Sequence, residues 1–313
     1  MSHHPLRLPT SLILTSALAV MLIACSGSAG ASAPTGGASG SPSGAPTSGP
    51  SGSPAVSPAT GAIDHATGAT DILLRYDEGG GFMMPAFTAA MTPHFTLYGD
   101  GTVLFRNPAQ EMPPAQGSVS VMNPLRIAKL SEEQIQDLLA YALGEGGLAA
   151  GRPEYRNDMI ADASTALFTI NAGGITKTVS VYALGLEMDG LPDGPARAAF
   201  GKLARRLTTL DQGGVVPSTA YTPETYRVSL FDAPGVVAPA VRVWPWGDIA
   251  VTDFKPAADP NGLQFPHRTM TAADLDLLNV TAYGGGFQNL VITGPDGVLY
   301  TLAARPILPD ELE

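Results

Sequence analysis

The sequence contains one cysteine and five histidines in 313 residues. A single cysteine excludes an internal disulfide and leaves no thiolate set for zinc. His3 and His4 stand at the amino end, His65 lies in a low-complexity stretch, and His94 and His267 are 173 positions apart. Histidines so few and so scattered predict no metal site, and nothing else in the sequence indicates a cofactor.

The usual catalytic motifs are also missing. The chain has no H-E-x-x-H, no G-x-S-x-G and no S-x-x-K, which removes the common markers of metalloproteases and serine hydrolases. The glycine run from Gly79 to Gly81 is not followed by G-K-[ST]. We therefore expect a loop or bulge there instead of a phosphate cradle, and we identify no catalytic residue.

Basic clusters are scarce. The chain has 17 Lys and Arg against 28 Asp and Glu, a net charge of −11. Nucleic acids and anionic lipid surfaces both require cationic patches, so neither is an expected partner. The one basic group, Lys202 with Arg205 and Arg206, is predicted to form a solvated helix face.

What the chain does have is an informative cysteine. Cys25 directly follows Leu22, Ile23 and Ala24 at the end of a 13-residue apolar run from Leu12. The run is shorter than the ~20 residues that a membrane-spanning helix needs, and Arg7 supplies the positive region of a signal peptide. We predict a lipoprotein signal peptide over 1–24, cleavage between Ala24 and Cys25, and lipid on Cys25. The mature protein, with a net charge of −12 once Arg7 is removed, would be anchored in the cell membrane on its extracytoplasmic face.

The segment 25–70 is predicted to be a flexible linker. It consists almost entirely of Ser, Gly, Ala, Pro and Thr, with Asp64 as its one charged residue. Such a composition offers too little apolar surface to offset the entropy of ordering. A chain of that length spans roughly 35–40 Å, enough to hold a folded domain away from the membrane. The same composition is compatible with O-glycans.

The remaining 243 residues, 71–313, predict an α+β fold of antiparallel hairpins and short packed helices. Phe95–Tyr98 and Val103–Phe105 flank a Gly-Asp-Gly turn, and Ala166–Ile170 and Ile175–Tyr182 flank Asn-Ala-Gly-Gly. The last of these strands alternates apolar with Thr and Ser, so we expect one face of its sheet to be only lightly covered.

Two helices are predicted between and after these hairpins. Ser131 and Gln134 form a capping box ahead of an apolar stripe. Pro195 opens a second helix with the same periodicity. The apolar stripes comprise Ile135, Leu138, Leu139 and Ala142 in the first helix, and Phe200, Leu203, Ala204 and Leu207 in the second.

The second half of the chain repeats this order in kind. Val241–Trp246 and Ile249–Phe254 flank Gly-Asp, Thr271 opens a looser capping box, and Leu290–Thr293 with Val298–Leu302 flank Gly-Pro-Asp-Gly. We interpret the recurrence as an internal duplication. The expected halves are 71–211 and 221–313, packed together because the shorter one buries proportionately less surface.

Several strings resemble a known family. They are GGGF from Gly79, P-x-F-x-L-Y-G-D-G from Pro93, D-x-x-T from Asp162, V-Y-A-L-G from Val181 and R-P-I-L-P-D-E from Arg305. As a set they resemble an uncharacterised family of secreted lipoproteins from actinobacteria and similar cell-walled bacteria. The family has no established activity, so the resemblance implies an address and an architecture but no catalytic residues.

Three features bear on binding. Trp244 and Trp246, the two tryptophans of the chain, stand close together, as in carbohydrate platforms and interface hot spots, although they can equally pack on the domain itself. A loop with Glu154, Asp158 and Asp162 offers carboxylates for calcium or glycoside chemistry, or forms a solvated loop. Asp100 is interpreted as a turn residue.

Two functions follow from this reading. The first is a non-enzymatic envelope module that binds a protein or glycan through its open sheet face or loops. The alternative is a cell-wall or glycan hydrolase with an unidentified carboxylate pair.

Overall fold

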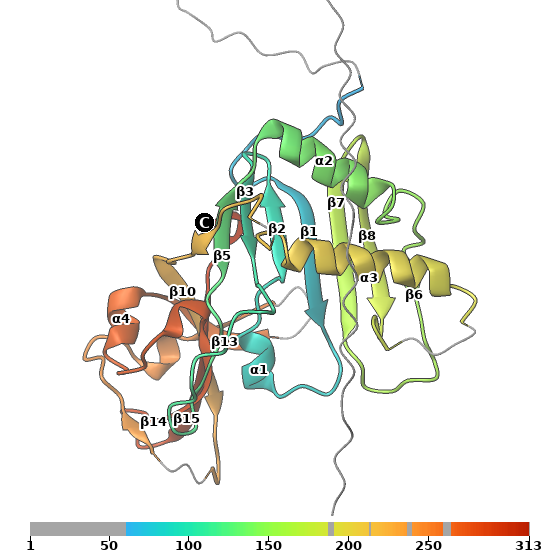
Figure 1. Cartoon of the computed structure of the whole chain (residues 1–313). Helices are drawn as coiled ribbons and strands as arrows, with labels where there is room; N and C mark the ends of the chain where they lie inside the picture. The colour runs from blue at the N-terminus through green and yellow to red at the C-terminus, as the bar shows by residue number, and fades with distance from the viewer. Residues whose placement is uncertain (1–60, 187–190, 213, 237–239, 259–263, 313) are drawn as a thin grey trace, which may run out of the picture. The chain divides into compact units, whose positions relative to one another are not determined.

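The computed structural model describes residues 61–186, 191–212, 214–236, 240–258 and 264–312 (Figure 1). The signal segment, Cys25 and most of the predicted linker lie outside the described residues. The described chain folds into two sheets of mainly antiparallel strands with a few short helices, which confirms the α+β class.

The first sheet is built from residues 72–220. Its strand order is β6-β8-β7-β1-β2-β3-β5-β9, and the β6–β8 pair is parallel. The predicted hairpins are confirmed as the β2–β3 and β7–β8 pairs. The strands are β1 (Ile72–Gly79), β2 (Phe95–Tyr98), β3 (Thr102–Phe105), β5 (Arg126–Lys129), β6 (Glu154–Tyr155), β7 (Thr165–Ala172), β8 (Ile175–Tyr182) and β9 (Thr219–Ala220).

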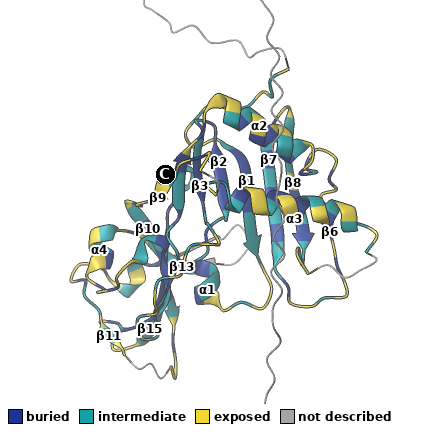
Figure 2. Ribbon diagram, in the orientation of Figure 1, coloured by how far each residue is buried: buried dark blue, intermediate teal, exposed yellow. Residues whose placement is uncertain are grey.

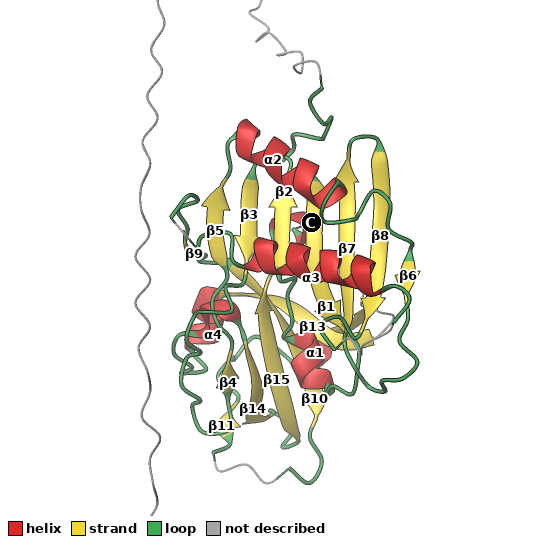
Figure 3. Ribbon diagram, turned by 45° about the vertical axis from the view of Figure 1, so that its right-hand side comes forward, coloured by secondary structure: helices red, strands yellow, loops and turns green. Residues whose placement is uncertain are grey.

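Two helices cover one face of this sheet (Figure 3). They are α2 (Glu132–Leu143) and α3 (Gly194–Thr208). Ser131 caps α2 through the predicted box with Gln134. The whole predicted stripe of α2 is buried, and in α3 Phe200, Leu203 and Leu207 are buried while Ala204 is half-buried. Burial of these stripes against the strands forms the larger of the two main cores.

The opposite face of the first sheet is lightly covered near β8, as predicted. Val179 and Val181 are buried under the helices, whereas Thr176 and Thr178 on the other face are exposed. Lys177 interrupts the apolar side, and its ammonium donates to the carbonyl oxygens of residues 148, 149 and 151. A cation among apolar side chains is thereby satisfied by backbone oxygens.

The second sheet is built from residues 225–306 with one addition from the first half of the sequence. Its order is β11-β14-β15-β10-β13-β12, and β4 (Ser120–Val121) pairs with β14. The closing hairpin was predicted correctly. The strands are β10 (Thr225–Asp232), β11 (Arg242–Val243), β12 (Lys255–Ala258), β13 (Gln264–Thr271), β14 (Phe287–Thr293) and β15 (Leu299–Pro306).

One predicted hairpin is wrong. Residues 241–254 do not pair with each other: β11 pairs in parallel with β14, and the 3₁₀ helix η1 (Val251–Asp253) follows. The indole N–H of Trp244 donates to the carbonyl of Ile249 at 2.9 Å, and Trp246 and Ile249 are both buried. The segment forms no hairpin, because its large apolar side chains point into the core and do not alternate between the two faces of a sheet.

The helix after this segment is short. Thr271 and Asp274 form the predicted capping box, but α4 spans only Ala272–Asp276. Asn279 has a φ of 52°, a left-handed conformation that a continuing helix cannot contain. Two further 3₁₀ turns, η2 (Tyr283–Gly285) and η3 (Pro309–Glu311), complete the elements after β13.

The structure does not show the predicted duplication. The opening strand of each half, β1 or β10, does lie between an earlier and a later hairpin. However, β1 pairs with the first strand of each hairpin, β2 and β7, whereas β10 pairs with the second strand of each, β13 and β15. The two halves share the order of their elements, but their strands pair differently.

The predicted boundary at residue 70 is wrong. Ile63 packs against the first core, and its backbone N–H and carbonyl both bond to the side chain of Gln136 on α2, at 2.7 and 2.9 Å. Gly173 donates to the carbonyl of Asp64 at 2.7 Å. The folded region therefore includes at least residues from Ile63 onward, because one isoleucine supplies the apolar contact that the composition of the segment conceals.

The boundary between the halves is also not a boundary in space. An arm of the first half, residues 106–125, carries β4 to the second sheet and places Val119 and Val121 in its core. In return, Leu308 of the second half packs with Tyr98 and Leu104 of the first. Among the described residues, no helix has the length and apolar character required to cross a membrane.

Candidate functional site

A short helix divides one face of the second sheet. The helix α1 (Pro85–Ala89) lies on Ala303 of β15, with Phe231 and Phe265 packed beside it. Figure 1 shows this helix between the two sheets, close to β13 and β15. Polar side chains line the cavity on one side of α1, and apolar side chains line the groove on the other.

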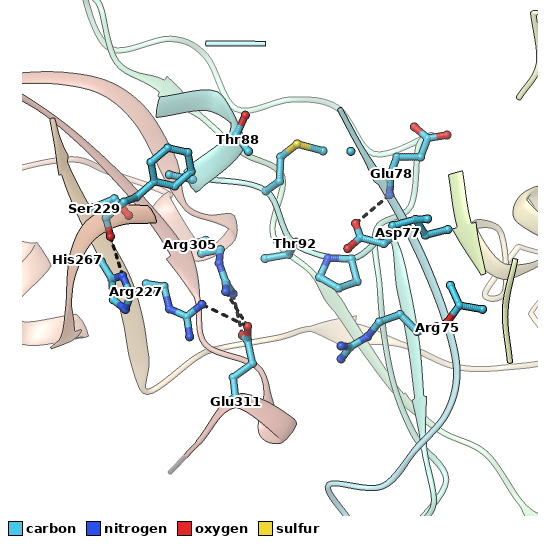
Figure 4. A pocket seen from close by; sticks show the side chains of 17 residues that line it. Arg75, Asp77, Glu78, Thr88, Thr92, Arg227, Ser229, His267, Arg305 and Glu311 are labelled. Carbon is cyan, nitrogen blue, oxygen red and sulfur yellow. Dashed lines mark hydrogen bonds and ion pairs between the residues drawn. The ribbon is translucent and has the colours of Figure 1, made fainter. Parts of the chain in front are cut away.

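The polar cavity is a cleft of about 430 Å³ between the two sheets. Because side chains alternate along a strand, Arg75 and Asp77 of β1 point away from the helices and into this cleft. From the other sheet come Arg227, Arg305 and His267 (Figure 4). Each wall therefore carries cationic side chains, and the cleft is polar although both sheets have apolar cores. The hydroxyl groups that line it belong to Thr88, Thr92, Thr178 and Ser229.

The last turn of the chain joins the two walls. Arg305 donates to both carboxylate oxygens of Glu311, at 2.7 and 2.6 Å, and Arg227 lies 3.6 Å from the same carboxylate. The neighbouring Asp310 accepts from Arg75 at 2.7 Å and from the hydroxyl of Tyr98 at 2.6 Å. Adjacent carboxylates of η3 thus bind one sheet each, which fixes the width of the cleft.

Two carboxylates that line the cleft, those of Asp77 and Glu311, have pKa values shifted in opposite directions. Burial raises the pKa of Asp77 above its ordinary range, and the backbone N–H of Glu78 and the charge of Arg75 offset only part of that. Burial also acts to raise the pKa of Glu311, but the hydrogen bonds and charge of Arg305 outweigh it and hold that pKa low. Two acids separated in pKa in this way can take different roles.

Two histidines that are far apart in the sequence lie near this cleft. His267 lines it, and His94 stacks on Tyr76 with its Nε2 3.8 Å from a carboxylate oxygen of Glu78. Burial lowers the pKa of both imidazoles, so both are neutral at pH 7. In the part of the chain that the structure describes, no three His, Cys, Asp or Glu side chains are grouped to hold a metal.

The two tryptophan candidates differ in burial. Trp246 is 5% exposed and donates its indole N–H to the carbonyl of Asp274 at 2.9 Å, as a core residue does. Trp244 is half-buried and packs edge-on against Trp246, with ring centroids 4.9 Å apart. Trp244 also lines a groove with Arg242, Leu277 and Asn279, so a binding role for it stays a prediction.

The structure also describes the predicted carboxylate loop and the predicted turn aspartate. Glu154 pairs with Arg156 at 2.7 Å, and Asp158 and Asp162 are exposed, as in a solvated loop. Asp100 accepts from the backbone N–H and hydroxyl of Thr102, which confirms it as the turn residue. Gly80 and Gly81 have φ values of 80° and 77°, as in the predicted loop.

Sequence reasoning missed the residues of the cleft. Arg75, Arg227 and Arg305 lie in three strands, and only sheet pairing brings the last two together: they are register partners of β10 and β15. One signal was present. The R-P-I-L-P-D-E string supplies Arg305, Asp310 and Glu311, so the terminal motif closes the cleft.

No protein-family model, curated protein or solved structure matches the chain. The resemblance to secreted lipoproteins therefore stays a prediction.

Proposed function

We propose that the protein is a lipid-anchored envelope module that binds a polar ligand, a glycan or a peptide segment, in the cleft between its sheets. The observation that carries the proposal is the lining of the cleft by charged side chains of both signs and by hydroxyl groups. Such groups fix the orientation of a polar ligand. The volume of about 430 Å³ falls within the range of small-ligand sites.

The anchor is the second part of the proposal. It rests on the Leu-Ile-Ala-Cys junction ending at Cys25 and on the short apolar run before it. We expect the mature chain to begin at Cys25 and to partition into the detergent phase, whereas Cys25→Ala should be released or remain a precursor. An intact mass with the amino terminus uncut, or with an unmodified cysteine, would contradict this part.

Binding can be tested with matched variants on one strand. Thr178 and Thr176 are both exposed on the same face of β8, and only Thr178 lines the cleft. We expect soluble disaccharide-peptide fragments of peptidoglycan to bind the full chain, Thr178→Trp to abolish that binding and Thr176→Trp to preserve it. Equal loss in both variants, or no binding by the wild type, would reject the cleft as the site for this ligand class.

The hydrolase remains a second candidate because of one observation. Asp77 and Glu311 both line the cleft (Figure 4), and burial raises the pKa of Asp77 whereas Arg305 holds the pKa of Glu311 low. A carboxyl group with a raised pKa and a carboxylate with a lowered pKa in one site are the pair that glycoside hydrolysis uses. Mass analysis of the same fragments after incubation separates the two functions: cleavage by the wild type that Asp77→Asn removes would establish the hydrolase.

A further inference from the structure

An apolar groove lies on the other side of α1 from the polar cleft. Its volume is about 740 Å³, and nine of its thirteen lining residues carry apolar side chains. Ala233 and Val291, which line it, are buried. Met84 at its edge is 63% exposed, and the nearby Phe82 is 91% exposed.

Exposed apolar side chains beside an apolar groove indicate a ligand that removes both from water. The groove and the cleft share one sheet face, and the contact of α1 with Ala303 separates them. Phe231 borders the groove and Phe265 the cleft, and the two rings pack edge to face with centroids 5.2 Å apart. The barrier between the sites is therefore itself apolar and well packed.

The residues that line the groove favour one class of ligand over another. A peptide lying in the groove would bring a backbone N–H and C=O at every residue, and four polar residues border the groove: Ser118, Asp232, Asn289 and Thr301. Each backbone group left without a partner costs more than the apolar contacts of a small residue return. A hydrocarbon chain has no such groups, so the same walls favour it.

The length of chain before the described residues indicates where an aliphatic ligand would come from. From Cys25 to residue 60 there are 36 residues, which span roughly 30–36 Å at this Ser, Gly, Ala and Pro composition. A domain on such a linker stays within reach of the bilayer to which the predicted lipid attaches it. Aliphatic chains are then the apolar ligands present at the highest local concentration.

We propose that the groove between α1 and the strands β10, β14 and β15 binds one aliphatic chain of a membrane lipid. The chain lies against Phe231 and Val291, and Met84 closes over it. It belongs to a separate lipid of the bilayer, and occupancy by the lipid on Cys25 is the competing outcome of the test.

The first experiment measures binding of an uncharged fluorophore with one undecyl chain, N-undecyl dansylamide, to the full chain carrying Cys25→Ala. We expect saturable binding at one site and about tenfold weaker binding by Met84→Glu, the loss that follows when one large apolar contact is removed. Met159→Glu is the matched control, because Met159 is 74% exposed and does not line the groove. No saturable binding, or equal weakening by both variants, overturns the proposal.

The second experiment distinguishes the two sources in the membrane-bound wild-type protein. A diazirine amino acid at position 84 is photolysed and its adducts are identified by mass, with the same substitution at position 159 as the control. Adducts to free lipid support the proposal, and adducts to the Cys25 lipopeptide overturn it in favour of the protein's own lipid. The same adduct yield at positions 84 and 159 overturns the proposal.

Discussion

The two sheets reach stability by different routes. The first has two helices of its own, α2 and α3, whose apolar stripes cover one complete face. Among the described residues the second has one α-helix of its own, the short α4, which is mostly exposed or half-buried (Figure 2). Its core is completed by Trp246 and Phe254 from irregular segments and by Val119 and Val121 from the first half. The two halves have a similar order of elements, but only the first covers its own sheet. The second needs residues of the first to complete its core.

This dependence predicts the largest effect. A fragment of residues 221–313 lacks β4, so Val119 and Val121 leave its core and the edge of β14 at Phe287 and Gln288 loses its partner. We expect this fragment to show no cooperative melt and a poorly dispersed NMR spectrum, because its remaining core is too small to offset the entropy of folding. Co-expression with residues 61–220 should restore a folded complex. A cooperative melt of the fragment alone would contradict the comparison.

The covering helices of the first sheet give the next effect. Leu207 of α3 is completely buried, and Leu207→Asp places a charge without a partner in that core. We expect the free energy of unfolding to fall by about 4 kcal/mol. Lys202→Asp, at an exposed position of the same helix, is the control and should change it by less than about 0.5 kcal/mol. Denaturant unfolding measures both, and similar losses would show that the helix does not cover the sheet.

The contact between the arm and the second sheet depends on a glycine. A Cβ at Gly285 would lie 1.9 Å from the carbonyl oxygen of Asn123, whereas at Gly284 the nearest atom would be 3.7 Å away. Arg106, whose pKa burial lowers to about 10, also donates here, to the carbonyls of Asn123 and Gly285.

The two glycines form a matched pair. We expect Gly285→Ala to cost about 3 kcal/mol, the upper part of the range for overpacking, because backbone must move. Gly284→Ala should cost less than about 1 kcal/mol, since its methyl group meets no close atom. Thermal melts of the full chain compare the two. Equal stabilities would mean that the arm is not pressed against the second sheet.

The parts of this fold that were predictable are those that neighbouring residues determine. The Ser131 cap, the β7–β8 hairpin and the β14–β15 hairpin each depend on a turn or cap within a few positions. The Gly247-Asp248 turn looked equivalent, but burial of Trp246 and Ile249 overrode it.

The candidate site was harder to predict from the sequence, because the contacts that form it are not local. A cleft that joins Arg75 to Asp310 across 235 positions requires the sheet pairing, which no local pattern specifies. His94 and His267 illustrate the point: their separation in sequence suggested that they are unrelated, yet both lie near one cleft.

Within the cleft, Glu311 gives a smaller and pH-dependent effect. Glu311→Gln replaces one of the two oxygens that accept from Arg305 with an amide N–H₂ group, and it removes the negative charge beside Arg305 and Arg227. We expect a loss of about 2 kcal/mol at pH 7, between the values for exposed and fully buried ion pairs. Because the folded-state pKa is below the ordinary 4.5, this stability is present above pH 4.5 and is lost as the pH falls further. The difference between wild type and variant should therefore shrink in acid, and a constant difference would assign the loss to packing.

Asp77 on the opposite wall should behave in the reverse sense, with the smallest effect. Its folded-state pKa is raised above the ordinary 3.8 because burial penalises the carboxylate, so ionisation costs stability as the pH rises through that pKa. Asp77→Asn keeps an oxygen that can accept the backbone N–H of Glu78, at 2.8 Å in the wild type, and removes the charge. We expect the variant to be slightly more stable than wild type at pH 7 and to lose this advantage below pH 3.8, where Asp77 is protonated. Chemical denaturation at the two pH values measures the difference. A variant more stable than wild type at pH 7 would support the proposed role of Asp77 in binding or chemistry, whereas a less stable variant would make Asp77 a structural residue.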